Sequence, residues 1–183
     1  MGTTVWFLLL PLVSAQTVGK GPCPSPPVKQ NFNVLQFLGQ WYEIEKIPVT
    51  FEVETCVTII YVLRKDGMLQ VWKTSEIHDR WLQILDGTAS FPDLREHAKL
   101  ALRFSHQPTE SNHWVLTTDY SNLSIMYSCT SFLDFWHLEY TWILSCFRTL
   151  PSETLDYAKD LLRETEIDTS TMKATDQTNC LGH

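Results

Sequence analysis

The fold is decided by the stretch Asn33-Val34-Leu35-Gln36-Phe37-Leu38-Gly39-Gln40-Trp41-Tyr42-Glu43-Ile44, which combines a helical turn with the start of a long strand. Val34, Phe37 and Leu38 recur at the spacing of one helical face. Gly39 can adopt a positive φ, so the chain can bend there. Trp41 is then the first bulky residue of the strand, and a buried indole covers on the order of 150–250 Å². We therefore expect this turn and Trp41 to close one end of a β-rich domain.

The rest of the chain predicts a series of short strands joined by hairpins. Alternating apolar positions and turn residues predict eight strands, over 41–48, 56–63, 68–74, 81–91, 99–104, 114–118, 123–130 and 135–146. Asp66-Gly67 supplies a hairpin turn, and Asp86-Gly87 is expected to interrupt the fourth strand. This regular spacing is typical of a β-sandwich or a β-barrel. After the strands, an apolar stripe at helical spacing predicts a helix over 151–165 that packs on the outside of the sheet.

Composition limits the possible functions. The 183 residues suit one domain, and 44% hydrophobic with 19% charged residues indicates a globular chain. The net charge of −7 is spread along the chain without a basic stripe, which excludes nucleic acid as a partner. The cysteines and histidines lack zinc-site spacing, and no motif supports haem ligation, so we expect neither a metal nor another cofactor.

Residues 1–15 are expected to be a secretory signal peptide. An apolar run over 5–13 precedes the small residues Val13-Ser14-Ala15, which predicts cleavage after Ala15. The mature chain, 16–183, would then be one extracellular domain with a proline-rich arm (16–30), a barrel (31–148), the helix (151–165) and a tail (166–183). Its five cysteines predict disulfides with one residue left over, without saying which one. Asn122 begins a glycosylation sequon.

Two short motifs resemble those of the lipocalin family. Gly39-x-Trp41 resembles the first lipocalin motif and Thr118-Asp119-Tyr120 the second. The resemblance implies an all-β fold, an eight-stranded antiparallel up-and-down barrel with one C-terminal α-helix packed outside. Further stretches resemble one branch of the family more closely: Asn31-Phe32, 38–48, Tyr127-Ser128-Cys129-Thr130 and 176–180. For this branch the resemblance implies the disulfides Cys23–Cys129 and Cys56–Cys180, which leaves Cys146 unpaired.

The sequence departs from the family at two places. The third lipocalin motif has an arginine that stacks on the tryptophan of the first motif, but Cys146 stands at that position here. Arg148 lies two residues further on with the same strand parity, and we expect it to stack on Trp41 instead. A family member also has an unpaired cysteine, used to link to partners, where this chain has Ser131.

The interior of the barrel is the candidate binding site. Seven tryptophans and nine phenylalanines favour a large cavity lined by apolar and aromatic side chains. Strand parity predicts that its wall includes Tyr61, Leu100, Leu102, Phe104, Leu138, Tyr140 and Trp142. The resemblance implies pocket positions for Tyr61 and Trp142 as well. We therefore expect a secreted carrier of fatty acids, steroids or similar lipids rather than an enzyme.

Two alternatives remain open. Some lipocalins isomerise a prostaglandin with a cavity cysteine on the second strand, but here Cys56 is better explained as a disulfide partner. The free thiol is Cys146, and His137 has the opposite strand parity, so we favour transport over catalysis. The second alternative is an interaction protein. Phe51 or the pair Phe132-Leu133 would dock on a lipoprotein particle or lipid surface, or Cys146 would form an intermolecular disulfide.

Overall fold

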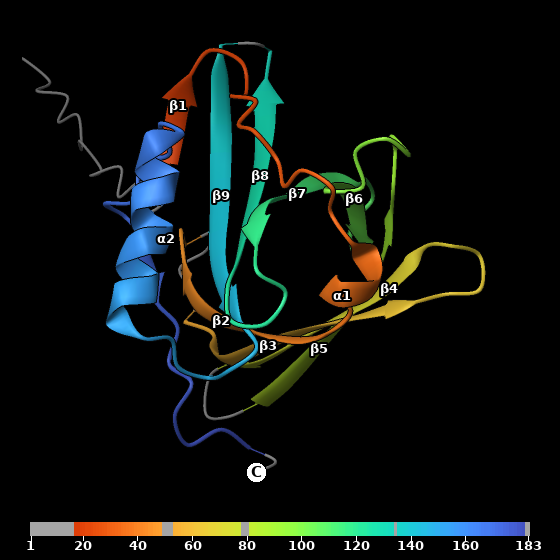
Figure 1. Ribbon diagram of the computed structural model, residues 1–183, viewed down its shortest axis with the longest axis vertical. Coiled ribbons are helices and arrows are strands. Elements are labelled where there is room, and N and C mark those ends of the chain that lie inside the picture. Colours follow the sequence, from red (N-terminus) through yellow and green to blue (C-terminus); the bar gives the residue numbers. More distant parts are fainter. Residues whose placement is uncertain (1–16, 49–52, 78–80, 134, 182–183) are drawn as a thin grey trace, which may run out of the picture.

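The computed structural model describes residues 17–48, 53–77, 81–133 and 135–181. The expected cleavage site after Ala15 and the loop residue Phe51 lie outside the described residues. The main body is a β-barrel with a long helix on its outer side (Figure 1).

Eight consecutive strands form the barrel, each antiparallel to the next: β2 (Gly39–Lys46), β3 (Thr55–Leu63), β4 (Leu69–Ile77), β5 (Trp81–Ser90), β6 (Lys99–Phe104), β7 (Ser111–Thr118), β8 (Ser124–Phe132) and β9 (Trp136–Ser145). Pairing of β9 back onto β2 closes the barrel. The expected eight-stranded antiparallel barrel is confirmed. Because β2 starts at the end that carries the helical turn, we call that end the floor. The opposite end, which holds the β2–β3, β4–β5, β6–β7 and β8–β9 connections, is the mouth.

Two further strands extend the sheet beyond the eight expected from the sequence. β1 (Thr17–Lys20) pairs with β9, so part of the arm is a strand. β10 (Lys173–Ala174) pairs with the last residues of β2. Neither segment shows the alternating apolar pattern of a buried strand, because both add to the sheet mainly through backbone hydrogen bonds.

The expected interruption at Asp86-Gly87 is wrong, because β5 runs unbroken from Trp81 to Ser90. Gly87 lies opposite Phe104 on β6, and a Cβ atom added at Gly87 would come within 2.8 Å of the Phe104 ring. The glycine therefore makes room for an aromatic ring across the strand pair instead of ending the strand.

Two helices accompany the barrel, α1 (Val34–Phe37) near the floor and α2 (Ser152–Glu164) outside. The Asn33 side chain caps α1 by accepting a hydrogen bond from the backbone N–H of Gln36. Ala158 and Leu162 of α2 are buried against Ile125 and Ile143, which face outward from β8 and β9. Figure 1 shows α2 on the outer side of the barrel, along β9. None of the helices in the described ranges is long and apolar enough to cross a membrane.

Two disulfides tie the terminal segments to the barrel. Cys23 in the arm bonds to Cys129 on β8, and Cys180 in the tail bonds to Cys56 on β3. These are the two pairings that the resemblance implies. Each closes a loop of more than a hundred residues, which in the chain-entropy model stabilises the folded state by roughly 4–5 kcal/mol.

Candidate ligand-binding site

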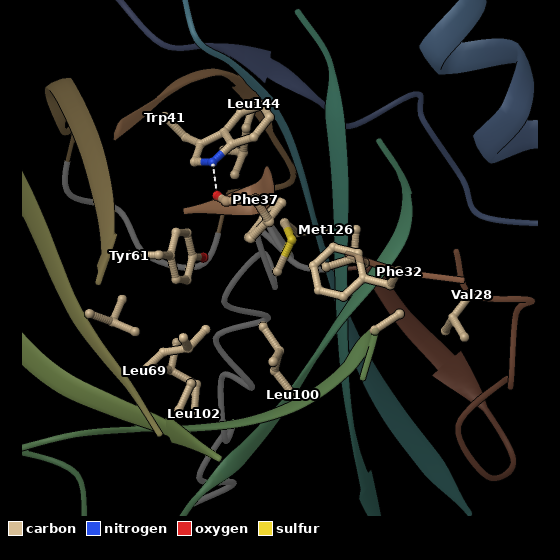
Figure 2. Close-up of a cluster of buried hydrophobic side chains, with 14 residues drawn as sticks. Val28, Phe32, Phe37, Trp41, Tyr61, Leu69, Leu100, Leu102, Met126 and Leu144 are labelled. Carbon is tan, nitrogen blue, oxygen red and sulfur yellow. Dashed lines mark hydrogen bonds between the residues drawn. The ribbon is translucent and has the colours of Figure 1, made fainter. Parts of the chain in front are cut away.

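The floor of the barrel is closed by Trp41 and the residues of α1. Gly39 has a φ of +110°, which turns the chain from α1 into β2. The Trp41 side chain is only 1% exposed, and its indole N–H donates to the Phe37 carbonyl oxygen at 2.9 Å. Figure 2 shows this bond, with the Phe37 ring between Trp41 and the rest of the interior. The Phe37 ring centroid lies 5.1 Å from those of Trp41 and Tyr61, so three aromatic rings seal the floor.

The second motif forms the β7–β8 turn at the same end. Asp119 accepts hydrogen bonds at 2.7–2.9 Å from the backbone N–H groups of residues 121–123. Burial alone would raise the pKa of Asp119, but these donors hold it below its usual range. The Tyr120 hydroxyl accepts from the Asn33 backbone N–H at 2.9 Å. The two motifs, 77 residues apart between Trp41 and Thr118, therefore meet at the floor.

The expectation that Arg148 stacks on Trp41 is wrong. The Arg148 guanidinium lies over the ring of Tyr42, 4.7 Å from its centroid, and donates to the Gln177 side chain at 3.2 Å. Tyr42 is next to Trp41 in β2 and therefore points to the opposite, outer face of the barrel. Arg148 thus links the outer wall to the C-terminal tail, while Phe37 covers Trp41 from inside.

The predicted wall residues occupy the inner face to different depths. Tyr61, Leu100 and Leu102 belong to the buried interior cluster, and Phe104 and Trp142 pack against it. Figure 2 shows Tyr61, Leu100 and Leu102 directed toward the middle of this cluster. Leu138 and Tyr140 lie on the same face of β9 as Trp142, half-buried and nearer the mouth. Whether these seven side chains contact a ligand stays a prediction.

Burial decreases along the inner face of β9 from the floor to the mouth. Leu144 beside the plug is 2% exposed, Trp142, Tyr140 and Leu138 are half-buried, and Trp136 is 49% exposed. The same face therefore changes from packed core to partly uncovered aromatic surface over five inward-facing residues of the strand. The side chains nearest the mouth are therefore the least covered by their neighbours.

Tyr61 has a polar group within the buried interior cluster near the floor. Within the described part of the chain, its hydroxyl makes no hydrogen bond, and burial raises the pKa of the phenol. A buried hydroxyl normally has a partner, so this group favours a hydrogen bond to a ligand or to water.

His113 is an interior residue that the sequence analysis missed. It pairs with Leu100 across β6 and β7, and its ring stacks on Trp142 with centroids 5.3 Å apart. Burial lowers the pKa of His113 to about 4, so the imidazole is neutral at physiological pH. The sequence offered a signal for this position, because His113 lies two residues before the buried Val115 in β7 and therefore shares its inward face. The sequence analysis also missed Lys46 and Lys73, which face the interior as well.

The remaining thiol has no features of an activated nucleophile. Cys146 is free and half-buried, and burial, together with the Asp119 carboxylate, raises the pKa of its thiol. His137 faces the outer side, where its ring nitrogen lies 3.0 Å from the Gly21 carbonyl oxygen. Among the described residues, the one group of three metal-ligand types within reach of each other is Cys56, Glu76 and Cys180. Its two sulfur atoms are already joined in a disulfide, so this group does not suit a metal ion.

The sequence of this chain is similar to those of several known proteins. The family model of the lipocalin-like domain matches residues 32–177. Apolipoprotein D of the rabbit, Oryctolagus cuniculus, is 41% identical over 172 residues, which covers 94% of this chain and 91% of that protein. The Lazarillo protein of Schistocerca americana is 30% identical and covers 96% of this chain and 83% of its own length.

Solved structures give the same fold at lower identity. Insecticyanin of the tobacco hornworm Manduca sexta superposes with a TM-score of 0.78 at 24% identity, over 90% of each chain. Lobster apocrustacyanin A1 gives a TM-score of 0.77 at 22% identity, over 88% of this chain and 92% of its own. The family model, the 41% identity to apolipoprotein D, the plugged barrel and the two disulfides agree: this chain belongs to the lipocalin family, as an apolipoprotein D-like member.

Proposed function

We propose that the protein is a secreted carrier that binds small hydrophobic molecules, such as a fatty acid or a steroid, inside the barrel. The observation that supports this most strongly is the inner face of β9, which is packed at Leu144 and partly uncovered from Trp142 to Trp136. A plugged floor below an apolar, aromatic wall suits a guest that enters through the mouth. Most of the predicted wall side chains are apolar or aromatic, so burial of apolar surface should supply most of the affinity.

The test is to remove the aromatic wall at Trp142. If a ligand covers about 50 Å² of this indole, burial at about 25 cal/mol per Å² contributes about 1.3 kcal/mol, close to a tenfold change in affinity. Trp142→Ala should therefore weaken binding of dodecanoate, measured by isothermal titration calorimetry, about tenfold. The matched control is Trp72→Ala, because Trp72 pairs with Ile60 and Asp86 on the outer face. Equal affinities in both variants, or no binding by the unmodified protein, would contradict the proposal.

Secretion depends on residues 1–15 acting as a removable leader, which would leave one domain over 16–183. Mass spectrometry of the protein from culture medium should find Gln16 at the N-terminus. Asn122 is exposed in the β7–β8 turn and stays the predicted glycosylation site. Treatment with a glycosidase should lower the mass of the secreted protein, and Asn122→Gln should abolish that change.

A second candidate function is attachment to a phospholipid surface such as that of a lipoprotein. Large apolar side chains are exposed around the mouth, and we call them the rim: Trp81, Phe132, Leu133, Phe135 and Trp136. Several relatives carry the name apolipoprotein D. We expect Leu133→Ser with Phe135→Ser to reduce flotation with phosphatidylcholine vesicles. Leu94→Ser is the control, because Leu94 is equally exposed but lies in the β5–β6 connection at the floor.

Catalysis and covalent linkage through Cys146 have less support. The half-buried thiol has a raised pKa, so little thiolate forms at neutral pH. No structural feature of the described residues favours the isomerase alternative over transport.

A further inference from the structure

Two lysines face the inside of the barrel wall. Lys46 ends β2 and lies directly opposite Trp142, and Lys73 on β4 lies directly opposite Ile59. Directly paired residues on neighbouring strands point to the same face, and both of these partners pack against the interior cluster. The lysine side chains are only 14% and 20% exposed. An ammonium group held this deep needs an anionic partner, because its loss of hydration is otherwise uncompensated.

The partner is one carboxylate, that of Glu54. One of its oxygens lies 2.6 Å from the Lys46 ammonium nitrogen, and the other lies 2.6 Å from that of Lys73. The Ser75 hydroxyl donates to the same carboxylate at 3.2 Å. Burial alone would raise the pKa of Glu54, but the two lysines lower it to about 2, so the group is ionised at physiological pH. Lys46, Lys73 and Ser75 therefore form a cradle shaped for a single carboxylate.

Glu54 occupies this cradle from the connection that precedes β3. It stands outside any strand, between the exposed Val53 and the first residue of β3. Its side chain is 13% exposed, so part of it already contacts solvent. Within the described ranges, Lys73 has no other carboxylate partner. Lys46 has a second one in Glu43, whose Oε1 lies 3.1 Å from the ammonium nitrogen and also accepts from the Thr175 hydroxyl at 2.6 Å.

We infer that Lys46 and Lys73 form a carboxylate-binding subsite, which Glu54 occupies when the barrel is empty and which the headgroup of an anionic amphiphile takes over. This inference rests on the proposed function, and it narrows the ligand class to long-chain monocarboxylates. The exchange replaces one carboxylate with another, so the buried charges stay balanced at two ammonium and two carboxylate groups. Glu54 regains its hydration at the mouth, while the acyl chain lies against Trp142.

A neutral ligand of the same length cannot make this exchange. If Glu54 moves away for an alcohol headgroup, Lys73 loses its counter-ion and Lys46 keeps only Glu43, so Glu54 stays in place. The subsite therefore discriminates by charge, and Glu54 acts as a competitor for carboxylate ligands only.

The test compares dodecanoate with 1-dodecanol, both titrated calorimetrically into the full mature chain. Glu54→Gln removes the competing carboxylate, and we expect it to tighten dodecanoate binding about tenfold while dodecanol binding changes less than about twofold. Lys73→Met should weaken dodecanoate binding about tenfold without weakening dodecanol binding. The matched controls are Glu153→Gln and Lys65→Met, which change the same charges at exposed positions away from the barrel interior.

A charge-balanced variant protects the test against misfolding. Glu54→Gln leaves a lysine without its partner, whereas Glu54→Gln combined with Lys73→Met retains the Lys46–Glu43 pair and no unpaired ammonium group. This double variant should lose the gain in dodecanoate affinity that Glu54→Gln alone provides. If dodecanoate and dodecanol respond alike in every variant, the subsite is refuted while the carrier function stands. If the unmodified protein binds neither compound, the carrier function fails, and the subsite fails with it.

Discussion

Gln177 closes a gap in the barrel wall, and its removal should cost more stability than its position in a polar tail suggests. The β2–β3 pairing extends only to Tyr42 opposite Thr58. Beyond that point the Gln177 amide donates to the carbonyl oxygens of Glu43 at 2.9 Å and Val57 at 2.8 Å. One side chain therefore supplies the donors that the missing strand pairing would have supplied.

The magnitude follows from those two bonds. In Gln177→Ala, both carbonyl groups lose their donor, and a buried polar group left unpaired costs about 1–3 kcal/mol. Partial access of water to the gap reduces this cost, so we expect a loss of about 2–4 kcal/mol in the free energy of unfolding. Gln177→Glu should be at least as damaging, because a carboxylate cannot donate to the two carbonyls and is repelled by them.

Urea unfolding with the disulfides intact measures this loss. The control is Gln107→Ala, which removes an exposed glutamine from the β6–β7 turn and should change stability by less than about 0.5 kcal/mol. Hydrogen exchange adds a local measurement, since the Thr175 amide donates to Ile44 and the Cys56 amide to Asp176. Both amides should exchange faster in Gln177→Ala. A stability loss equal to that of the control would refute the idea that this side chain seals the wall.

Three further predictions concern the floor, the cradle and the thiol. Asp119→Ala removes the acceptor of three backbone N–H groups and should lower the free energy of unfolding by about 1–3 kcal/mol, measured by urea unfolding; a loss below about 0.5 kcal/mol would contradict the role of the turn. Because the pKa of Glu54 is lower in the folded state, at about 2, than its usual 4.5, the stability it contributes is complete above pH 4.5 and lost as the pH falls toward 2. This loss in the free energy of unfolding is on the order of 1–2 kcal/mol after solvent screening. It should be absent in Glu54→Gln when unfolding is measured as a function of pH. Because the Cys146 thiol has a raised pKa, iodoacetamide should modify it more slowly at pH 7.4 than a cysteine in an unfolded peptide, and an equal rate would show that it is accessible and ionised.

The floor of the barrel could be predicted from the sequence because it depends on local chemistry. Gly39 permits the positive φ, and Trp41 two residues later is too large and apolar to stay exposed. The Asp119 carboxylate accepts the backbone N–H groups of the turn that follows β7, and the donors and the acceptor all lie within residues 119–123. Regular alternation then gives most of the barrel, since each strand buries one face against the interior.

The terminal segments could not be predicted because their structure comes from their partners. β1 and β10 join the sheet through backbone groups, and their side chains carry little signal for strand formation. Arg148 illustrates the same limit at one residue. Its parity with the family arginine predicted a contact with Trp41, but residues 146–148 follow the end of β9, where strand alternation no longer fixes direction. The guanidinium lies over Tyr42 and bonds to Gln177, a residue that the sequence does not place nearby.

The inward lysines were missed for two different physical reasons, and both bear on the ligand. Counting alternate residues from Trp41 places Lys46 on the outer face, but a β-bulge between Glu43 and Glu45 shifts the register and turns Lys46 inward beside Trp142. Lys73 has the inward parity of Val71, yet a lysine on a strand is normally assigned to solvent. A bulge that brings a charge into an apolar barrel costs stability unless that charge is paired, and Glu54 pairs it from a connection rather than from a strand. The proposed exchange requires Glu54 to leave the two lysines, and its place on a connecting segment rather than in a strand is consistent with that.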